Sequence, residues 1–384
     1  MNKKIVIIGA GISGLYIANL LRQNQNYEIT VCEKNNSVNL EQGYGIQLSV
    51  NSIKLLNIIG FKNINSKEKF HPNKLDFYSL VNKKKICDLD ISAFNTSEAK
   101  YTTLQRFTLI NFLKGRLPDN LINYNKKVTA INYETENIKV IFENNTSIKC
   151  DYLIISDGTF SKTKSLIAKK EINPQYFNSI ALRATIDKDN LKEINPNNIS
   201  LSLGSNLHTV SYPISNSNHF NFISILRKKL TTKELSNFSL FENKEFISSV
   251  LSEISKQIDP DIIKNLKDIR CFPIFVSSEI YQPTNKKTFL IGDAFFALPP
   301  TFAQGASQSI EVAHEIYKNL EGGANKLNHE RIKKTKTINI KSKFNYFAFH
   351  LSNPLIIWIR NIIMRYLVRN KKFINYYFGK IYKN

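Results

Sequence analysis

The chain has 384 residues, a hydrophobic content of 42% and a formal net charge of +22. This length predicts two packed units with a sizeable core, and no apolar run approaches the roughly 18 residues that a membrane span needs. The lysines are spread among many asparagines and isoleucines, and no helix-turn-helix, zinc-finger or aromatic-basic module stands out, so we expect no nucleic-acid partner.

Four cysteines, Cys32, Cys87, Cys150 and Cys271, stand far apart without paired or metal-like spacing. Such spacing is typical of reduced core thiols. We therefore expect a cytoplasmic protein without a metal site.

The first predicted element is a strand over residues 3–8, which leads directly into the turn Gly9-Ala10-Gly11-Ile12-Ser13-Gly14 and then a helical pattern. Strand, glycine turn and helix in this order are typical of a dinucleotide site. Gly9 allows the turn, Gly11 leaves bare backbone for a pyrophosphate, and Gly14 lets the helix approach the strand. Free N–H groups at the helix start attract the phosphates.

A second strand, over residues 27–32, ends at Glu33 and is followed by Lys34. The 19 residues from Gly14 to Glu33 are the expected reach to a ribose, whose hydroxyls a carboxylate accepts. An ordinary strand-to-helix turn in another α/β protein is the alternative. The strand, the helix and the acidic residue together favour a dinucleotide without identifying it.

Further along, a glycine-bracketed loop over residues 43–52, which includes Gly45, precedes a helix that stops at Gly60. A β-hairpin is predicted over residues 75–89. A helix is predicted over residues 103–113, with Arg106 at its start, where a guanidinium helps neither the helix dipole nor a core. That position favours a ligand role for Arg106, and a solvated arginine is the alternative.

A buried strand then brings Asp157-Gly158 to the carboxyl edge of the sheet, where open α/β sheets bind ligands; a simple Asp-Gly turn is the alternative. Short strands at residues 179–186, 201–203, 208–213 and 220–226 predict a largely antiparallel sheet that forms one wall of a pocket. A strand over residues 288–291 then returns to the first pattern. It leads to Gly292-Asp293, a loop with Pro299, and Gln304-Gly305-Ala306 at the start of a long helix.

Five motifs in this order resemble the single-component FAD-dependent aromatic hydroxylases, the group that includes salicylate, hydroxybenzoate and ubiquinone-precursor hydroxylases. The motifs are Gly9 to Gly14 with Glu33; residues 43–60; Gln105-Arg106 with Leu109 and Leu113; Asp151 through Asp157-Gly158 with Ser161; and Gly292-Asp293-Ala294 through Pro299, Gln304-Gly305 and Gln308. The resemblance covers nearly the whole chain. In the middle sheet, Leu182-Arg183 and Gly204 through His208 to Tyr212-Pro213 resemble the salicylate hydroxylases in particular.

The resemblance implies an α/β fold with a Rossmann-like FAD-binding domain, an inserted and mostly antiparallel β-sheet substrate domain, and C-terminal helices. The FAD-binding domain would be discontinuous, over residues 1–70, 101–170 and 279–345. The substrate domain would take residues 71–100 and 171–278, and the C-terminal helical segment residues 346–384.

The resemblance also implies a role for each matched residue. The three glycines would hold the pyrophosphate, Glu33 the adenosine ribose, Arg106 the phosphate and ribityl region, and Asp293 the ribityl chain or pyrophosphate. Asp157 would serve both FAD and NAD(P)H, and Gln304-Gly305 would lie beside the pyrimidine end of the isoalloxazine. The full candidate cofactor set is Gly9, Ala10, Gly11, Ser13, Gly14, Glu33, Lys34, Gly45, Arg106, Asp157, Gly158, Gly292, Asp293, Pro299, Gln304, Gly305 and Ala306.

In such enzymes NAD(P)H reduces the flavin, O2 adds to give a C4a-hydroperoxide, and the distal oxygen transfers to an electron-rich ring. We therefore expect FAD as cofactor, a small phenolic substrate, O2, and NAD(P)H as a transient co-substrate, because no second glycine fingerprint appears. The alternatives are a ubiquinone-biosynthesis hydroxylase acting on a prenylated phenol at the membrane surface, an FAD-dependent reductase without hydroxylation, and a non-catalytic basic surface-binding protein. The oligomeric state, monomer or homodimer, stays open.

Catalytic residues are not identifiable from the sequence, because the flavin carries the oxygen chemistry. His208 and Tyr212 are the candidates, and for His208 a hydrogen-bonded structural role is the favoured alternative. The chain departs from the family pattern at Phe296, where His is usual, and at Lys164, where Arg is usual. It also has Ile155-Ser156 for Gly-Ala and Ala303-Gln304-Gly305 for Gly-Gln-Gly. Because Ala303 tolerates a positive φ poorly, we expect an altered loop over the flavin.

After Pro354, apolar residues at 355, 356, 359, 362, 363, 366 and 367, with Trp358 and interspersed arginines, predict a basic amphipathic helix. We expect this helix to pack on the FAD-binding domain. The alternative is a helix that lies on an anionic membrane, as a peripheral contact at its inner face.

Overall fold

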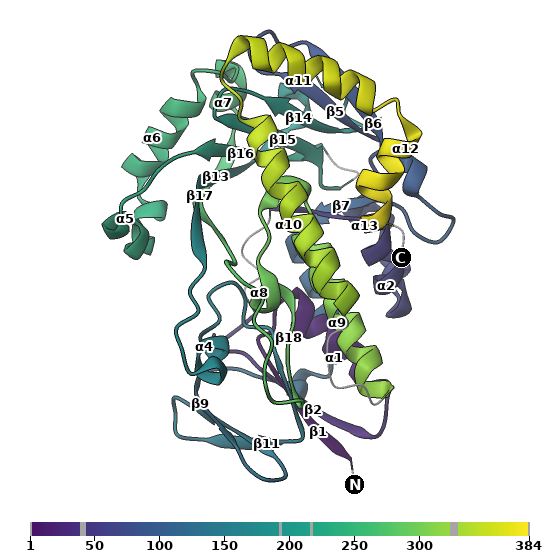
Figure 1. Ribbon diagram of the computed structural model, residues 1–384, viewed down its shortest axis with the longest axis vertical. Helices are drawn as coiled ribbons and strands as arrows, with labels where there is room; N and C mark the ends of the chain where they lie inside the picture. Colours follow the sequence, from purple (N-terminus) through teal and green to yellow (C-terminus); the bar gives the residue numbers. More distant parts are fainter. Residues whose placement is uncertain (1, 39–43, 192–193, 216–217, 323–328, 383–384) are drawn as a thin grey trace.

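The computed structural model describes residues 2–38, 44–191, 194–215, 218–322 and 329–382. A parallel five-stranded sheet of order β18-β12-β1-β2-β8 lies in the half of the molecule near the N-terminus (Figure 1). Its strands are β1 (Lys3–Ile8), β2 (Tyr27–Cys32), β8 (Ile122–Asn123), β12 (Tyr152–Ile155) and β18 (Thr288–Leu290).

The register of this sheet aligns the carboxyl ends of three strands, where the sequence predicts the cofactor site. Ile8, at the end of β1, pairs with Cys32 on one side and Ile155 on the other. The residues that follow the three strands, Gly9, Glu33 and Ser156, therefore meet at one edge of the sheet. The β-branched side chains of β1 are almost fully buried, as expected for a parallel strand covered on both faces.

Helices cover this sheet. The helix α1 (Ile12–Leu21) packs against α3 (Arg106–Gly115) and α9 (Gly305–Glu321). Two shorter helices lie near the same edge, α4 (Lys162–Ala168) and α8 (Gly292–Phe296), and a small antiparallel sheet is formed by β9 (Val128–Tyr133), β10 (Ile138–Phe142) and β11 (Ser147–Cys150).

A seven-stranded sheet of order β17-β13-β16-β15-β14-β5-β6 makes up the other half, and every pairing in it except β14 with β5 is antiparallel. Its strands are β5 (Lys74–Ser79), β6 (Lys85–Asp90), β13 (Gln175–Asp187), β14 (Ile199–Leu203), β15 (Leu207–Pro213), β16 (His219–Arg227) and β17 (Lys267–Val276). Around it lie α5 (Thr232–Ser236), α6 (Lys244–Ile254) and α7 (Pro260–Lys264). A third sheet consists of β3 (Gly45–Leu48), β7 (Thr102–Gln105) and β4 (Lys69–Phe70), and both β3 and the helix α2 (Val50–Ile58) contact α9.

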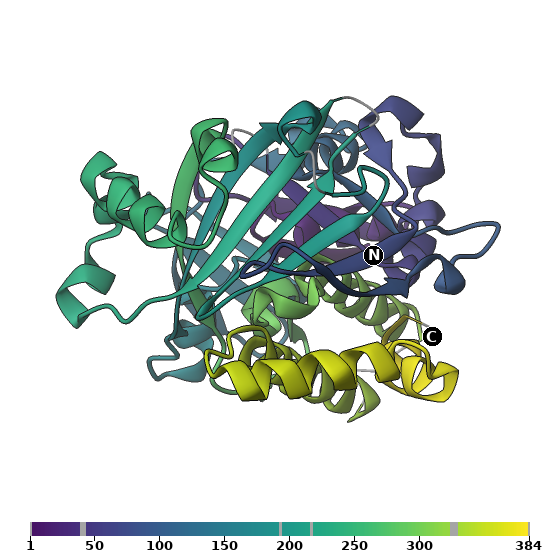
Figure 2. The same ribbon diagram turned by 90° about the horizontal axis from the view of Figure 1, so that it is seen from above.

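The chain ends in a run of helices. They are α10 (His329–Phe349), α11 (Pro354–Leu367), α12 (Lys371–Ile374), a π-helical turn (Asn375–Gly379) and α13 (Lys380–Tyr382). Seen from above, α11 runs along one side of the seven-stranded sheet (Figure 2). No helix in the described part of the chain is long and apolar enough to span a membrane.

The predicted fold class is confirmed: a parallel Rossmann-like sheet is joined to a mostly antiparallel one. The residue boundaries of the two domains stay a prediction, and Gly43 of the predicted loop lies outside the described residues. The helix predicted over residues 103–113 begins only at Arg106, because Thr102 and Thr103, which are β-branched, lie in β7. The C-terminal segment contacts both parts of the molecule, since α11 packs on the edge strand β6 of the seven-stranded sheet and the last helix packs on α2.

Candidate functional site

Two of the three glycines in the first turn are required by packing, and the third leaves room. A Cβ on Gly9, whose φ is +101°, would lie 2.6 Å from the carbonyl oxygen of Ser156. One on Gly14 would lie 2.1 Å from the carbonyl oxygen of Gly9, so helix α1 touches the end of β1. At Gly11 nothing lies within 4 Å of the added carbon. The turn is therefore closed where it meets the fold and open where a phosphate would sit.

Ser156, where the family usually has Ala, fastens this turn. Its hydroxyl lies 2.8 Å from the carbonyl oxygen of Ile8 and 2.9 Å from that of Gly9, and it can donate to either. The substitution therefore links the ends of β12 and β1 at the point where the chain enters α1.

A cavity of about 310 Å³ opens beside the turn. Its lining includes Gly9, Ala10, Gly11, Glu33, Lys34, Arg106, Asp157 and Gly158, eight residues of the predicted cofactor set. The carboxylate of Glu33 accepts hydrogen bonds from the backbone N–H groups of Ala10, at 2.9 Å, and Asn35, at 3.0 Å, and is thereby held at the cavity. One oxygen of Asp157, Oδ1, is buried without a hydrogen-bond partner among the described residues. A ligand hydroxyl would satisfy it.

A second and larger cavity, of about 760 Å³, adjoins the first. Phe160 lines both. The larger cavity is also lined by Gly45 and Asp293 and by Ala303, Gly305 and Ala306 at the start of α9. Thr159 donates a hydrogen bond to Asp293 at 3.3 Å, while burial raises the pKa of that carboxyl and Arg106 and Lys164 oppose the shift. The residues predicted to bind the two ends of the cofactor therefore line two neighbouring cavities, with Phe160 in the wall of both.

The larger cavity has a cationic group in its wall. Arg183, on β13, donates from Nη2 to the carbonyl oxygen of Gly45 at 2.9 Å and lies 5.1 Å above the ring of Tyr44. Its Nε is buried and has no partner within the described part of the chain. Burial lowers the pKa of Arg183, and Tyr212 and Tyr44 favour its charged form. The cavity therefore presents an uncompensated positive charge, suited to a phenolate or carboxylate.

Comparison with known proteins decides the family. Residues 2–328 match the model of a family described as an FAD binding domain. The chain belongs to this family. It is 22% identical over 360 residues to the 3-amino-4-hydroxybenzoate 2-monooxygenase PtnB3 of Streptomyces platensis, covering 91% of this chain and 89% of that one. It is also 23% identical over 336 residues to the 6-hydroxynicotinate 3-monooxygenase of Pseudomonas fluorescens, at 85% and 84% coverage.

The fold is likewise shared with solved members. HpxO of Klebsiella pneumoniae, whose structure was determined with FAD and uric acid, superposes with a TM-score of 0.83 at 15% identity and covers 99% of this chain and 96% of its own. FAD is the cofactor, and the chain is an FAD-dependent monooxygenase of the aromatic hydroxylase type, as the sequence predicted. The residues at the two cavities fit this cofactor, because Gly11 leaves its place open and Asp157 keeps an acceptor for it.

Five residues of the predicted cofactor set line neither cavity: Ser13, Gly14, Gly292, Pro299 and Gln304. Gly292, at φ +62°, passes so close to α1 that a Cβ would lie 2.4 Å from the hydroxyl of Ser13. Gly14, Gly292 and Ser13 thus bring the elements around the cofactor into contact. Whether the backbone of any of the five also contacts FAD stays a prediction.

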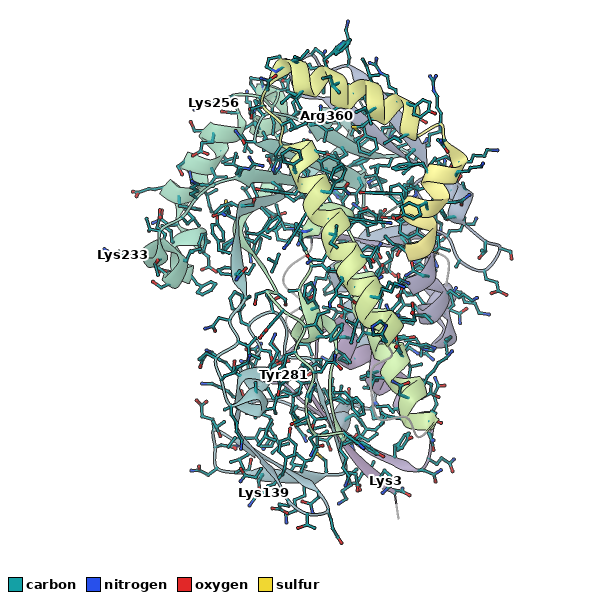
Figure 3. The ribbon with its side chains drawn as sticks, viewed as in Figure 1. Lys3, Lys139, Lys233, Lys256, Tyr281 and Arg360 are labelled. Carbon is teal, nitrogen blue, oxygen red and sulfur yellow. The ribbon has the colours of Figure 1, made fainter. Side chains whose placement is uncertain are left out.

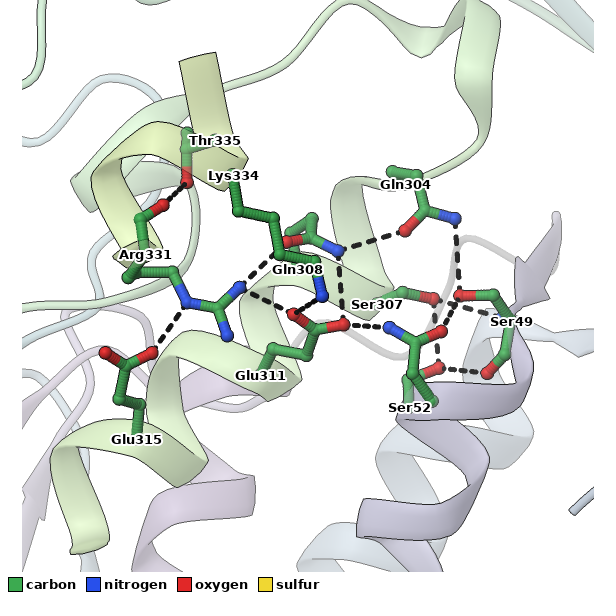
Figure 4. Close-up of polar contacts among 11 residues, drawn as sticks. Ser49, Ser52, Gln304, Ser307, Gln308, Glu311, Glu315, Arg331, Lys334 and Thr335 are labelled. Carbon is green, nitrogen blue, oxygen red and sulfur yellow. Dashed lines mark hydrogen bonds and ion pairs between the residues drawn. The ribbon is translucent and has the colours of Figure 1, made fainter. Parts of the chain in front are cut away.

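Gln304 belongs to a buried polar network (Figure 4). Its side-chain amide donates to the hydroxyl of Ser49 at 3.2 Å and accepts from Gln308 at 3.0 Å. The network continues to Glu311, which is 1% exposed and bonds Arg331 at 2.5 Å and Lys334 at 2.9 Å. It joins the start of α2, the first turns of α9 and α10. The start of α9 is therefore held in place by side chains from α2 and α10.

The two catalytic candidates lie in the wall of the larger cavity. His208 forms a 2.7 Å hydrogen bond through Nδ1 with Nε2 of His350, at the end of α10. Burial lowers the pKa of His208 to about 3 and that of His350 to about 2. This environment favours the structural role for His208, because a group with so low a pKa is a poor base for a phenol. The pKa of Tyr212 is raised to about 12 by burial, against Arg183.

Sequence reasoning missed two polar residues of the larger cavity. Tyr101 donates to the side chain of Gln47 at 2.8 Å, and both line the cavity. Neither belongs to a recognisable motif. They meet because β3 and β7 are paired, and no local sequence pattern predicts this pairing.

Proposed function

We propose that this flavoprotein hydroxylates a phenolic ring with NAD(P)H and O2. The observation that carries the proposal is that the two cavities are neighbours, with Phe160 in the wall of both. One is built for a phosphate and ribose by Gly11 and Glu33, and the other holds Arg183 and Tyr212 beside the start of α9. A flavin that spans both would present its ring to an anionic aromatic.

When bound, FAD supplies the transfer of one oxygen atom from O2 to the ring, with electrons from NAD(P)H. The side chains do the rest. Arg183 would orient the substrate through its oxyanion, and Tyr212 would hydrogen-bond the same end. The backbone N–H groups of Gly305 and Ala306 would stabilise negative charge at the flavin. The apolar walls exclude water from the ring.

NAD(P)H would bind only transiently. The sequence carries one glycine fingerprint, and FAD would occupy the turn at Gly11. Lys164, 3% exposed, lies close enough to Asp157 and Asp293 for their charges to raise its pKa against the effect of burial. This cation would contribute to the motif proposed to serve both nucleotides.

A second candidate is a phenol with a hydrocarbon chain, such as a prenylated one, received at a membrane surface. The observation that favours it is the composition of the larger cavity. Many of its lining residues are apolar and come from the seven-stranded sheet and the C-terminal segment, among them Phe77, Ile91, Leu201, Met364, Leu367 and Phe373. A chain would fill this region.

The test is a flavin absorption spectrum of the purified protein, followed by NAD(P)H oxidation with a panel of phenols with and without alkyl chains. We expect a yellow protein, oxidation accelerated by the right phenol, and a product one oxygen heavier by mass spectrometry. A yellow protein that consumes NAD(P)H without any hydroxylated product would be a reductase. A colourless protein with steeply salt-dependent affinity for anionic surfaces would overturn the enzyme assignment.

A further inference from the structure

Helix α11 turns a continuous apolar face away from the molecule. Leu355 is 64% exposed, Trp358 61% and Tyr366 69%. The other members of this outward face are Ile356, Ile359, Ile362 and Ile363, all exposed. In a 14-residue helix this is nearly one full side, and it is the stripe that the sequence pattern predicted as buried. Exposed apolar patches of this kind mark interaction sites.

The helix is held in this orientation by its other side. Arg360, marked in Figure 3, is buried and donates from Nη1 to the carbonyl oxygen of Ala348 at 3.0 Å. Met364, Leu367 and Val368 line the larger cavity. The inward side is thus occupied by a buried arginine and by the wall of the substrate cavity. The outward face is left uncovered within the described part of the chain.

The surroundings of the outward face are basic. From Arg331 to the last residue the sequence has thirteen Lys and Arg and no Asp or Glu. Arg369, Lys371 and Lys372, directly after α11, are exposed. A second copy of the chain placed on this face would bring like charges together. An anionic lipid surface would neutralise them and cover the apolar side chains at once.

We propose that α11 docks in the plane of an anionic lipid bilayer, with its outward face in the boundary between headgroups and acyl chains. A helix of 14 residues is too short to span a bilayer, which agrees with a helix that lies on it. Docking sets the cavity wall formed by Met364 and Leu367 directly beneath the lipid surface. The biological purpose of docking rests on the second candidate function, delivery of a phenol with a hydrocarbon chain. Docking itself can be tested by binding alone, without enzymatic activity.

Trp358 is the only tryptophan of the chain and reports on the contact directly. We expect vesicles of phosphatidylglycerol and phosphatidylcholine to shift its emission to shorter wavelength and to sediment the FAD-loaded protein, whereas phosphatidylcholine alone does neither. The variant Ile359→Glu/Ile362→Glu should bind at least ~10-fold more weakly. Ile58→Glu, at an equally exposed apolar position on α2, is the matched control and should bind like the wild type.

Three results would overturn the proposal: no binding of the wild type to anionic vesicles, equal binding by the double variant, or a lipid-free dimer that the double variant converts to monomer. The last would assign the face to a second copy. Hydroxylation of a water-soluble phenol without vesicles is measured separately in all three proteins. If the wild type does not hydroxylate any phenol in this assay, the result counts against the proposed function and not against docking.

Discussion

The two cavities are built in different ways. The cofactor cavity lies at the ends of three neighbouring parallel strands, and the bare backbone of the turn at Gly11 is its central feature. The substrate cavity is made of side chains from separate strands and from the C-terminal helices. Its chemistry depends on Arg183, Tyr212 and their neighbours. A backbone site is specified by spacing along the chain, whereas a side-chain site is specified by which distant segments pair.

The largest expected effect is at the cradle itself. Gly11→Val places a branched side chain in the open space meant for the pyrophosphate, so we expect loss of the flavin absorption and of all activity. The fold should persist, because nothing in the protein lies within 4 Å of the new carbon. Gly115→Val, equally free of contacts at the end of α3, is the control and should stay yellow. A Gly11→Val protein that is still yellow would contradict the prediction that the FAD pyrophosphate binds at Gly11.

The next effect tests the buried network that supports the start of α9. Arg331→Met removes the cation that pairs with both Glu311 and Glu315 across α9 and α10, while Lys334 keeps its ion pair with Glu311. Removing one member of a buried ion pair costs about 3–5 kcal/mol of unfolding free energy. Because Lys334 still pairs with Glu311, we expect a loss at the lower end of this range, about 3 kcal/mol, in urea denaturation of the FAD-loaded protein. Lys333→Met, an exposed neighbour on α10, should change little. Equal stability of the two variants would mean that the network does not support α9.

A third prediction separates the cavities. Arg183→Met removes the cation of the substrate cavity, so we expect kcat/KM for an anionic phenol to fall about 10- to 100-fold through KM, the value of one charged hydrogen bond. The flavin spectrum and FAD affinity should not change. Arg270, opposite Arg183 in the register of β13 and β17 but exposed, is the control position, as Arg270→Met. Loss of FAD in Arg183→Met would show that the two cavities are not independent.

This difference between backbone and side-chain sites also explains what the sequence could predict. The strands β1, β2, β12 and β18 and the cofactor edge follow from glycines and buried runs that are contiguous in the chain. Eight predicted residues indeed line the smaller cavity. The family resemblance places Gln304 beside the flavin, and this placement stays a prediction. Its partners Ser49 and Gln308 come from the start of α2 and the same helix, and the buried network they form left no local signal.

The C-terminal segment shows the same limit. The apolar period of α11 was correctly predicted as helical, but a period does not say which side faces inward. The contacts of Arg360 and Met364 decide that, and they involve α10 and the cavity. The pair of His208 and His350 also joins residues 142 positions apart. Only the tertiary fold reveals such partners.

The smallest effect concerns the loop over the flavin. Ala303 lines the larger cavity at φ +51°, the left-handed region that the sequence departure from Gly-Gln-Gly led us to suspect. In this region a residue with a Cβ destabilises the folded state by roughly 1 kcal/mol. Glycine removes this strain, but it also makes the unfolded chain more flexible, which cancels part of the gain in stability. We expect Ala303→Gly to stabilise the protein by about 0.5 kcal/mol, seen as a rise of ~1 °C in Tm. Ala297→Gly, at φ −79°, should instead lower Tm. If both substitutions lower Tm, the strain at Ala303 is absent and the altered loop has another cause.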